Sequence, residues 1–257
     1  MSWSWRDNAG RVVWPVLIGE GFPHLQAAAV FVQVDARKIM VDCGALENRE
    51  TIKTRLAQRG VHPSDIDLVL LTHGHFDHIE NVDLFDHAQV VIHRHELEFL
   101  ERLLGARPAS RREVIHQYHA MIPEFYVRTI SRRLDQHAST YQRLARELNR
   151  AAQPIEDDTR IADRAAIITT PGHTRGHLSL CIEDCQPIWI AGDAVTSLQS
   201  WRRESPEIYA DLPDSIESSR RIRRSGGVVI PGHDRPFDIQ SGQLVAPDHH
   251  GVRFNHE

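Results

Sequence analysis

Short apolar runs separated by polar turns make up the first part of the chain and predict a mixed α/β structure. Residues 30–34 and 38–42 each have the pattern of a strand, and the polar connection between them predicts a β-hairpin. Residues 47–58 have the pattern of a helix, and Gly60 is placed to end it. The apolar run at residues 68–71 predicts a buried strand.

The segment from residue 94 to residue 150 has a different pattern. After another predicted strand at residues 89–93, apolar residues recur at helical spacing and β-prone runs are few. We therefore expect one domain that spans residues 1–257, a normal length for a single domain, with a helical insertion at about residues 94–150. The positions that carry the helical spacing are Leu97, Leu100, Leu103, Leu104, Ile130, Leu134, Tyr141, Leu144 and Leu148.

Charge is distributed unevenly between the insertion and the remainder of the chain. Residues 94–150 hold 11 Arg against 7 Asp and Glu, a balance of +4, although the net charge of the whole chain is −5. One interpretation is a solvated or dimer-forming helical face. The other is a lid over an active site that favours an anionic or polar substrate. If the insertion walls the active site as a lid, we expect that deletion of residues 108–150 changes substrate preference and leaves the metal ligands intact.

A cluster of candidate metal ligands follows the predicted strand at residues 68–71. His73, His75, Asp77 and His78 lie within six residues. The two histidines that are two residues apart share one face of the chain, whereas Asp77 and His78 come after the chain has turned. This arrangement suits two adjacent metal ions better than one, and the alternative is a histidine-rich surface turn.

Three more residues of the same chemical type stand further along the chain. His173, Asp193 and His233 each follow a short apolar, β-prone run and lie beside a glycine that permits a tight turn. Four strand ends would then deliver seven candidate ligands to one edge of a sheet. Imidazole and carboxylate groups without thiolate suit Zn²⁺, Fe²⁺ or Mn²⁺ and do not choose among them.

In this order, the candidate ligands resemble the pattern of the metallo-β-lactamase-fold hydrolase superfamily, and the context at residues 172–177 and 232–234 is similar to that of acyl-homoserine lactonases. The resemblance extends from residues 41–44 to residues 231–233. It implies a four-layer αββα sandwich with a dinuclear metal site at one edge. The implied ligands are His73, His75 and His173 for one ion, Asp77, His78 and His233 for the other, and Asp193 as the bridge between them.

The resemblance also implies the chemistry of the site. Two divalent ions are expected, Zn²⁺ first and Fe²⁺ or Mn²⁺ as alternatives, and a hydroxide at the dinuclear site would attack the substrate. Asp193 and Asp77 are expected to serve catalysis, Asp77 by steering or accepting a proton. Asp42 either supports a ligand or is a turn carboxylate, and His177 is expected to orient or pack rather than to bind metal.

The substrate class is less constrained than the metal site, because one fold serves many reactions. We expect a carbonyl ester, most of all a lactone, with Phe22 and Leu25 either contacting an acyl chain or packing in the core. Where lactonases carry a tyrosine three residues after the bridging aspartate, this chain has Thr196, whose shorter hydroxyl is a weaker candidate for orienting the carbonyl. A thioesterase is one alternative.

A second resemblance keeps phosphodiester cleavage open. Residues 72–85, Trp201 and residues 231–237 are similar to a small single-domain subgroup that includes a nuclease acting on RNA ends. A nuclease usually presents a basic face, so the sequence pI of about 6.4 and the net charge of −5 weigh against nucleic acid, while the arginine-rich insertion leaves it open.

Composition bears on the setting in which the protein works. The N-terminus lacks a basic segment followed by an apolar stretch, and no apolar run approaches the roughly 20 residues of a membrane span. The three cysteines are an odd, sparse set that suggests reduced thiols. We expect a cytoplasmic enzyme that acts on a small molecule without a membrane partner, and a homodimer through the insertion is left open.

Overall fold

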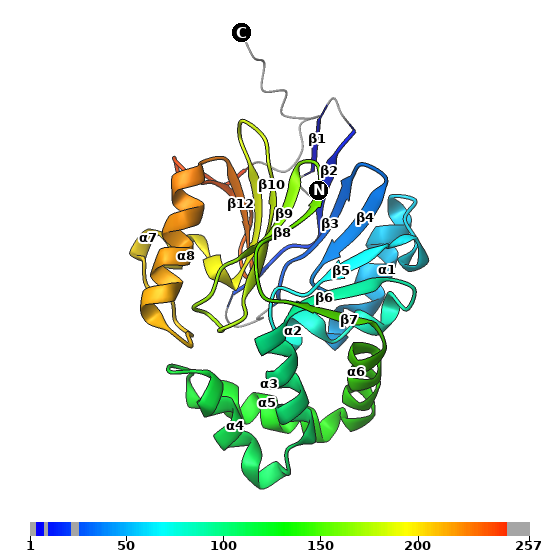
Figure 1. The fold of residues 1–257 in the computed structure, drawn as a ribbon, viewed down its shortest axis with the longest axis vertical. Coiled ribbons are helices and arrows are strands. Elements are labelled where there is room, and N and C mark those ends of the chain that lie inside the picture. The colour runs from blue at the N-terminus through cyan, green and yellow to red at the C-terminus, as the bar shows by residue number, and fades with distance from the viewer. Residues whose placement is uncertain (1–3, 8–9, 22–25, 246–257) are drawn as a thin grey trace.

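The computed structural model describes residues 4–7, 10–21 and 26–245 of the chain. Two β-sheets face each other, and helices cover the outer face of each (Figure 1). The first sheet has the order β1 (Trp5–Arg6), β2 (Val12–Leu17), β3 (Ala29–Val34), β4 (Arg37–Val41), β5 (Leu68–Leu70), β6 (Gln89–His93) and β7 (Ala152–Ile155). The second has the order β13 (Phe237–Asp238), β12 (Val228–Pro231), β11 (Ile188–Gly192), β10 (Leu178–Ile182), β9 (Ala165–Thr169) and β8 (Thr159–Ala162).

The helices divide between the two sheets. In Figure 1, α7 and α8 cover the second sheet, α1 covers the first, and α3–α6 lie together beyond one end of both. The bounds are α1 (Arg49–Gln58), α2 (Phe76–Ile79), α3 (Arg94–Gly105), α4 (Arg111–Tyr118), α5 (Glu124–Gln136), α6 (Ala138–Ala151), α7 (Leu198–Arg203) and α8 (Leu212–Ser225).

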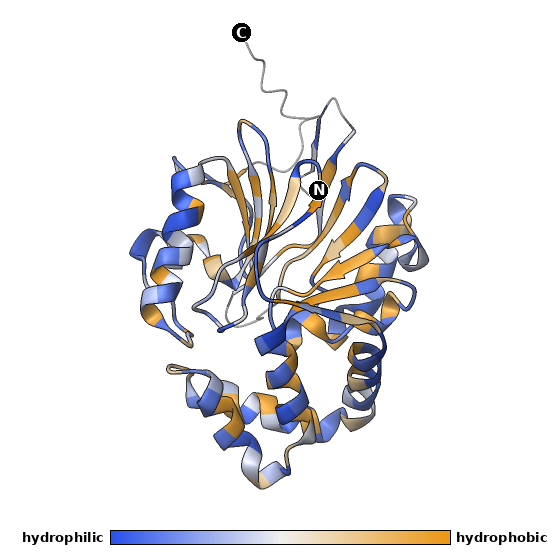
Figure 2. Ribbon diagram, viewed as in Figure 1, coloured by the Kyte–Doolittle hydropathy of each residue, from blue (hydrophilic) through white to orange (hydrophobic). Residues whose placement is uncertain are grey.

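Alternation of side chains along the strands explains the layers. In β4, Ile39 and Val41 belong to the core between the sheets, whereas Met40 packs in the core beneath the helices. In β11, Ile190 faces the first sheet and Trp189 lies in the core on the outer side, with residues of α7 and α8. Figure 2 shows the strands dominated by apolar residues and the outer faces of the helices by hydrophilic ones. The predicted αββα sandwich is confirmed.

The strand directions bring several strand ends to one edge. Strands β9 and β11 both run antiparallel to β10, so they point the same way, and β12 is parallel to β11. In the other sheet, β4, β5 and β6 are parallel. The turns that follow β5, β9, β11 and β12 hold the candidate ligands. The expected strands at residues 30–34, 38–42, 68–71 and 89–93 match β3 to β6 within one residue at each end.

Residues 94–151 hold the four helices α3 to α6 and connect two neighbouring parallel strands, β6 and β7. The apolar faces of these helices continue the core beneath the first sheet, with Phe99, Leu100, Leu144 and Leu148 buried. Several of the arginines in this segment bind carboxylates of the same chain, which favours the interpretation of a solvated, salt-bridged surface. These ion pairs are Arg94–Glu156, Arg111–Asp135, Arg112–Glu124, Arg133–Glu47, Arg133–Glu80, Arg143–Asp83 and Arg150–Glu147.

Two local expectations need comment. The predicted helix at residues 47–58 is split, because Leu46–Asn48 forms a separate 3-10 turn ahead of α1. Phe22 and Leu25 lie outside the described residues. Within the described ranges, none of the helices has the length and apolar character that crossing a membrane requires. A homodimer through the insertion stays a prediction.

Candidate metal centre

The seven candidate ligands lie together in the structure, in two groups that share a boundary. In the first group, His73, His75, His173 and Asp193 each offer one donor atom, and these atoms lie within 4.8 Å of one another. In the second group, the same holds for the donor atoms of Asp77, His78 and His233.

Asp193 stands where the two groups meet. Its Oδ2 atom lies 3.4 Å from Nε2 of His173 and 3.4 Å from Nε2 of His233, one residue from each group. Its Oδ1 atom lies 3.6 Å from Nε2 of His78. A carboxylate that faces both groups has the placement required of a bridging ligand.

Each donor owes its position to a strand end. His73 comes three residues after β5, His75 is the residue before α2, and Asp77 and His78 lie in the single turn of that helix. Asp193 follows β11, and His233 follows the parallel strand β12. Position 232, directly before His233, accepts only glycine, because a Cβ atom there would stand 1.8 Å from Oδ1 of Asp193.

Asp42 orients two of the histidines. Its Oδ2 atom lies 2.8 Å from Nδ1 of His78 and accepts a hydrogen bond of 2.8 Å from the Thr72 hydroxyl. That hydroxyl therefore has a lone pair free for Nδ1 of His73, which is 3.0 Å away. In both rings Nδ1 then carries a proton, and Nε2 is the nitrogen with no hydrogen-bond partner. Asp42 also sits in the left-handed region at φ 60°, so it is a supporting residue and a turn residue at once.

His177 uses both ring nitrogens within the protein. Its Nε2 atom accepts a hydrogen bond of 3.0 Å from the backbone N–H of Asp193, so Nδ1 donates to the Thr170 hydroxyl at 2.8 Å. This histidine therefore holds the backbone of the central carboxylate, as an orienting residue does. His93 is likewise structural, because its Nδ1 accepts from the N–H of His95 at the start of α3.

The electrostatics of the cluster keep the rings of the first group neutral, favour protonation of His78 in the second, and keep the carboxylate between them ionised. Burial lowers the pKa of His73 and of His75 well below the usual histidine value, and it also lowers the pKa of His173. Burial raises the pKa of Asp193, but the rings of His233, His173 and His78 outweigh it and hold that pKa well below its usual range. For His78, burial opposes protonation, but the carboxylates of Asp42, Asp77 and Asp193 raise its pKa to about 10.

Several buried donor atoms make no hydrogen bond, which tests whether the cluster fits metal ions. Among the described residues, Nε2 of His73, Nε2 of His78 and Oδ1 of Asp193 are buried and make no hydrogen bond. Burying a polar atom unpaired costs free energy, so such atoms are rare in folded proteins. Bare imidazole nitrogens beside a carboxylate are what divalent transition metals bind. The residues present therefore fit a pair of divalent ions.

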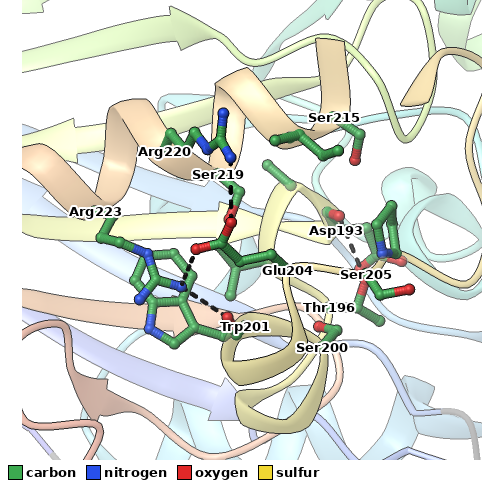
Figure 3. Close-up of a pocket in the computed structure, with 14 residues that line it drawn as sticks. Asp193, Thr196, Ser200, Trp201, Glu204, Ser205, Ser215, Ser219, Arg220 and Arg223 are labelled. Atoms are coloured by element: carbon green, nitrogen blue, oxygen red, sulfur yellow. Dashed lines mark hydrogen bonds and ion pairs between the residues drawn. The ribbon is translucent and has the colours of Figure 1, made fainter. Parts of the chain in front are cut away.

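Thr196 lies beside the cluster, on the wall of a neighbouring pocket. Its hydroxyl is 3.5 Å from the backbone oxygen of Asp193. The pocket runs between α7 and α8 (Figure 3), and three of its charged residues, Glu204, Arg220 and Arg223, contact each other or Trp201. Glu204 lies 3.4 Å from Arg220 and 3.9 Å from Arg223, and the guanidinium of Arg223 stacks 4.0 Å from the ring centroid of Trp201. The role of Thr196 in orienting a carbonyl stays a prediction.

The insertion supplies residues near the cluster that sequence reasoning missed. Nε2 of His119 lies 2.9 Å from Nε2 of His75, from which it is separated by 44 residues. Burial raises the pKa of Tyr126 to about 12, and the carboxylates of Asp77, Glu207 and Asp193 act in the same direction. The Tyr126 phenol thus stays protonated. Neither residue belongs to a local motif, so the sequence held no spacing signal for them.

Comparison with known proteins gives evidence of the chain's family that is independent of the site geometry. A family model described as the metallo-beta-lactamase superfamily matches residues 23–233. The chain is 27% identical over 213 residues to metallo-beta-lactamase domain-containing protein 1 of Xenopus laevis, covering 80% of this chain and 71% of that protein. It is 26% identical over 234 residues to the probable metallo-hydrolase YflN of Bacillus subtilis, covering 82% and 81%. It is 23% identical over 184 residues to the N-acyl homoserine lactonase AttM of Azorhizobium caulinodans, covering 68% and 60%.

Solved structures show the same fold. The hydrolase AbOPH of the beta lactamase superfamily aligns with a TM-score of 0.67 at 17% identity, covering 99% of this chain and 98% of that one. AidC, a dizinc quorum-quenching lactonase solved with a product, aligns with a TM-score of 0.63 at 16% identity, covering 97% and 96%. At these identities, the likeness concerns the fold.

Proposed function

This chain belongs to the metallo-β-lactamase superfamily of metal-dependent hydrolases, and we propose that its seven-residue cluster binds two divalent ions that serve the hydrolysis of a lactone. The observation that carries the proposal is the set of buried, unpartnered donor atoms on His73, His78 and Asp193 within the described residues. Zn²⁺ is the first choice of metal, and Fe²⁺ or Mn²⁺ suits the same donors.

The proposed division of ligands follows the two groups. One ion would be held by His73, His75 and His173, the other by Asp77, His78 and His233, with Asp193 shared between them. When bound, two ions at such a site lower the pKa of a water molecule and polarise the oxygen of a substrate carbonyl or phosphoryl group.

The chain's own residues would assist in two ways. The side chain of Asp77 is 29% exposed, against 5% for Asp193, so Asp77 is the carboxylate placed to exchange a proton with substrate or solvent. Thr196 and Tyr126 are the two hydroxyl groups proposed to orient the substrate carbonyl. Tyr126 has the longer reach, and its raised pKa keeps the phenol a hydrogen-bond donor.

A lactone with an acyl chain is favoured over a phosphodiester by three observations. Lactonases are among the similar proteins in sequence and in fold. Many arginines of the insertion bind carboxylates of this chain, which reduces the positive surface open to a polyanion. Two apolar residues of the insertion, Met121 and Phe125, are each 46% exposed. Met121 is two residues after His119, and Phe125 directly precedes Tyr126. Such a surface suits an acyl chain.

A substrate panel on metal-loaded protein tests the proposal. Acyl lactones, aryl esters, thioesters, bis-p-nitrophenyl phosphate and single-stranded RNA would be compared by kcat/KM, with metal content measured on the same sample. We expect two ions per chain and the highest kcat/KM on lactones. A plateau at one ion would contradict the dinuclear site. A higher kcat/KM on phosphodiesters or RNA would replace the lactonase by a nuclease, and one on thioesters would replace it by a thioesterase.

A further inference from the structure

We infer that the helical insertion is a working part of the metal centre, in which His119 positions His75 by fixing which ring nitrogen faces the first ion. The inference rests on the proposed metal-binding function. It assigns to a residue of the insertion a role that neither the ligand motif nor the fold assigns.

The protonation pattern of the two rings follows from their partners. His119 is 3% exposed and comes directly after α4. Its Nδ1 atom lies 2.9 Å from the backbone oxygen of Ile115, and a carbonyl oxygen can only accept, so Nδ1 carries the proton. In the neutral ring Nε2 is then bare and accepts from Nε2–H of His75 at 2.9 Å. This leaves Nδ1 of His75 as a bare nitrogen directed toward the first group.

His173 directs a second bare ring nitrogen toward Nδ1 of His75. Its Nδ1 atom lies 3.1 Å from the backbone oxygen of Ile208, so its Nε2 atom is bare as well. The two bare nitrogens, Nδ1 of His75 and Nε2 of His173, stand 3.1 Å apart. With both protons on the far sides of the rings, no hydrogen bond joins these atoms, and their lone pairs repel unless a cation takes up both.

The insertion also fixes the segment that holds His173. Met121, two residues after His119, pairs with Tyr209 in an antiparallel bridge. The two backbone hydrogen bonds of the bridge measure 2.9 and 3.1 Å. Tyr209 follows Ile208, whose carbonyl oxygen sets the proton of His173. One short stretch of the insertion therefore acts on two of the three histidines assigned to the first ion.

Two buried carboxylates tie the insertion to the ligand loops. Glu96 of α3 is 2% exposed and accepts hydrogen bonds of 2.9 Å from the N–H of Gly74 and 2.9 Å from the N–H of Gly176. These glycines lie in the loops that carry His73 to His75 and His173. Glu80, directly after α2, binds Arg133 of α5 at 2.5 Å and the Tyr141 hydroxyl of α6.

These contacts change the expectation that the insertion is a lid that can be shortened without effect on the ligands. Because His119, Met121 and Glu96 hold three parts of the first group, metal binding and the docking of α4 must stabilise each other by the same factor. Loss of a group that orients a ligating histidine typically weakens metal binding about 10- to 100-fold. Metal should stabilise the docked insertion in equal measure.

The test compares two substitutions at one position in the full chain. His119→Phe keeps a planar ring but removes the acceptor, whereas His119→Gln keeps an acceptor oxygen. His116→Phe is the matched control, because His116 lies three residues earlier, in the last turn of α4, with a side chain that is 42% exposed. Affinities for both Zn²⁺ ions would be measured by competition with a chelator. We expect H119F to bind one ion about 10- to 100-fold more weakly, H119Q to recover most of that loss, and H116F to match the unmodified protein.

Hydrogen exchange on the unmodified protein provides a second measurement that needs no variant. Removal of zinc should speed amide exchange in residues 111–123 about 10- to 100-fold. Exchange in β2 should be unchanged, because none of the candidate ligands lies there. The inference is overturned if H119F binds both ions with unchanged affinity or if H119Q loses as much affinity as H119F. It is also overturned if the amide exchange rate in residues 111–123 is the same with and without zinc. Failure of the unmodified protein to bind zinc would instead overturn the proposed function.

Discussion

The substitution Asp42→Asn probes the support of the second ion with little change of shape. Asp42 is 2% exposed and receives three hydrogen bonds, from the Thr72 N–H, the Thr72 hydroxyl and Nδ1 of His78, all at 2.8 Å. The side-chain amide of asparagine can accept hydrogen bonds only at its oxygen atom. If that oxygen keeps the Thr72 N–H, the NH₂ group faces the Thr72 hydroxyl and His78, and His78 must move its proton to Nε2. The nitrogen that faced the ion is then blocked.

The magnitude follows from the bond that is lost. A hydrogen bond to a charged partner contributes about 1.5–3 kcal/mol, and each 1.4 kcal/mol is about a tenfold change in affinity. We therefore expect the second ion to bind about 10- to 150-fold more weakly in D42N, with a smaller effect on the first ion through Thr72 and His73.

A chelator-competition titration that resolves the two sites would measure this change. Asp35→Asn is a suitable control, because Asp35 is exposed and has the same left-handed backbone, with φ 54° against 60° for Asp42. The same substitution is then made at the same backbone geometry, away from Thr72 and His78. Wild-type affinity for both ions in D42N, or an equal loss in D35N, would refute the reasoning.

Three further predictions concern single side chains. Asp193→Ala should lose one ion and nearly all activity while keeping its far-ultraviolet circular dichroism, and a variant that still holds two ions and turns over normally would exclude the bridging role. Tyr126→Phe should lower kcat on lactones about 10²-fold or more at unchanged metal content, in line with the loss of one oxyanion donor, whereas a larger loss in Thr196→Val would assign the role to the threonine. Arg133→Met should lower the free energy of unfolding by about 3–5 kcal/mol in denaturant titrations, because it leaves the buried carboxylate of Glu80 without its positively charged partner. A change under about 1 kcal/mol would contradict that account.

The candidate site divides sharply into what the sequence could predict and what it could not. His73, His173, Asp193 and His233 could be placed because each stands at the end of an apolar strand, and parallel strands bring their ends to one edge. The role of Asp42 was ambiguous in the sequence, because a carboxylate suits both a turn and the support of a ligand. The structure shows that Asp42 serves both roles.

The part of the site that the sequence could not predict consists of contacts between segments far apart in the chain, which no sequence periodicity relates. His119 reaches His75 only because α3 packs against β6 and β7 and α4 packs on α3. Helical spacing predicts helices without their direction. Glu96 sits on a helix whose pattern predicted its apolar face, yet its carboxylate is buried with the ligand loops. The sequence could predict the strands because each shows its own alternation, whereas the docking of the insertion depends on tertiary packing.

The path of the chain through the insertion has an evolutionary consequence. Because β6 and β7 are parallel neighbours, residues 94–151 leave the sheet at the end of β6 and re-enter it beside the start of β6. A parallel pair always needs such a crossover, so this connection can vary in length between relatives without any change in strand order. Under the proposed role of His119, a chain with a shorter crossover would lack the contact that positions His75. Relatives with a shorter connection are expected to hold the corresponding histidine with a group from elsewhere in the chain.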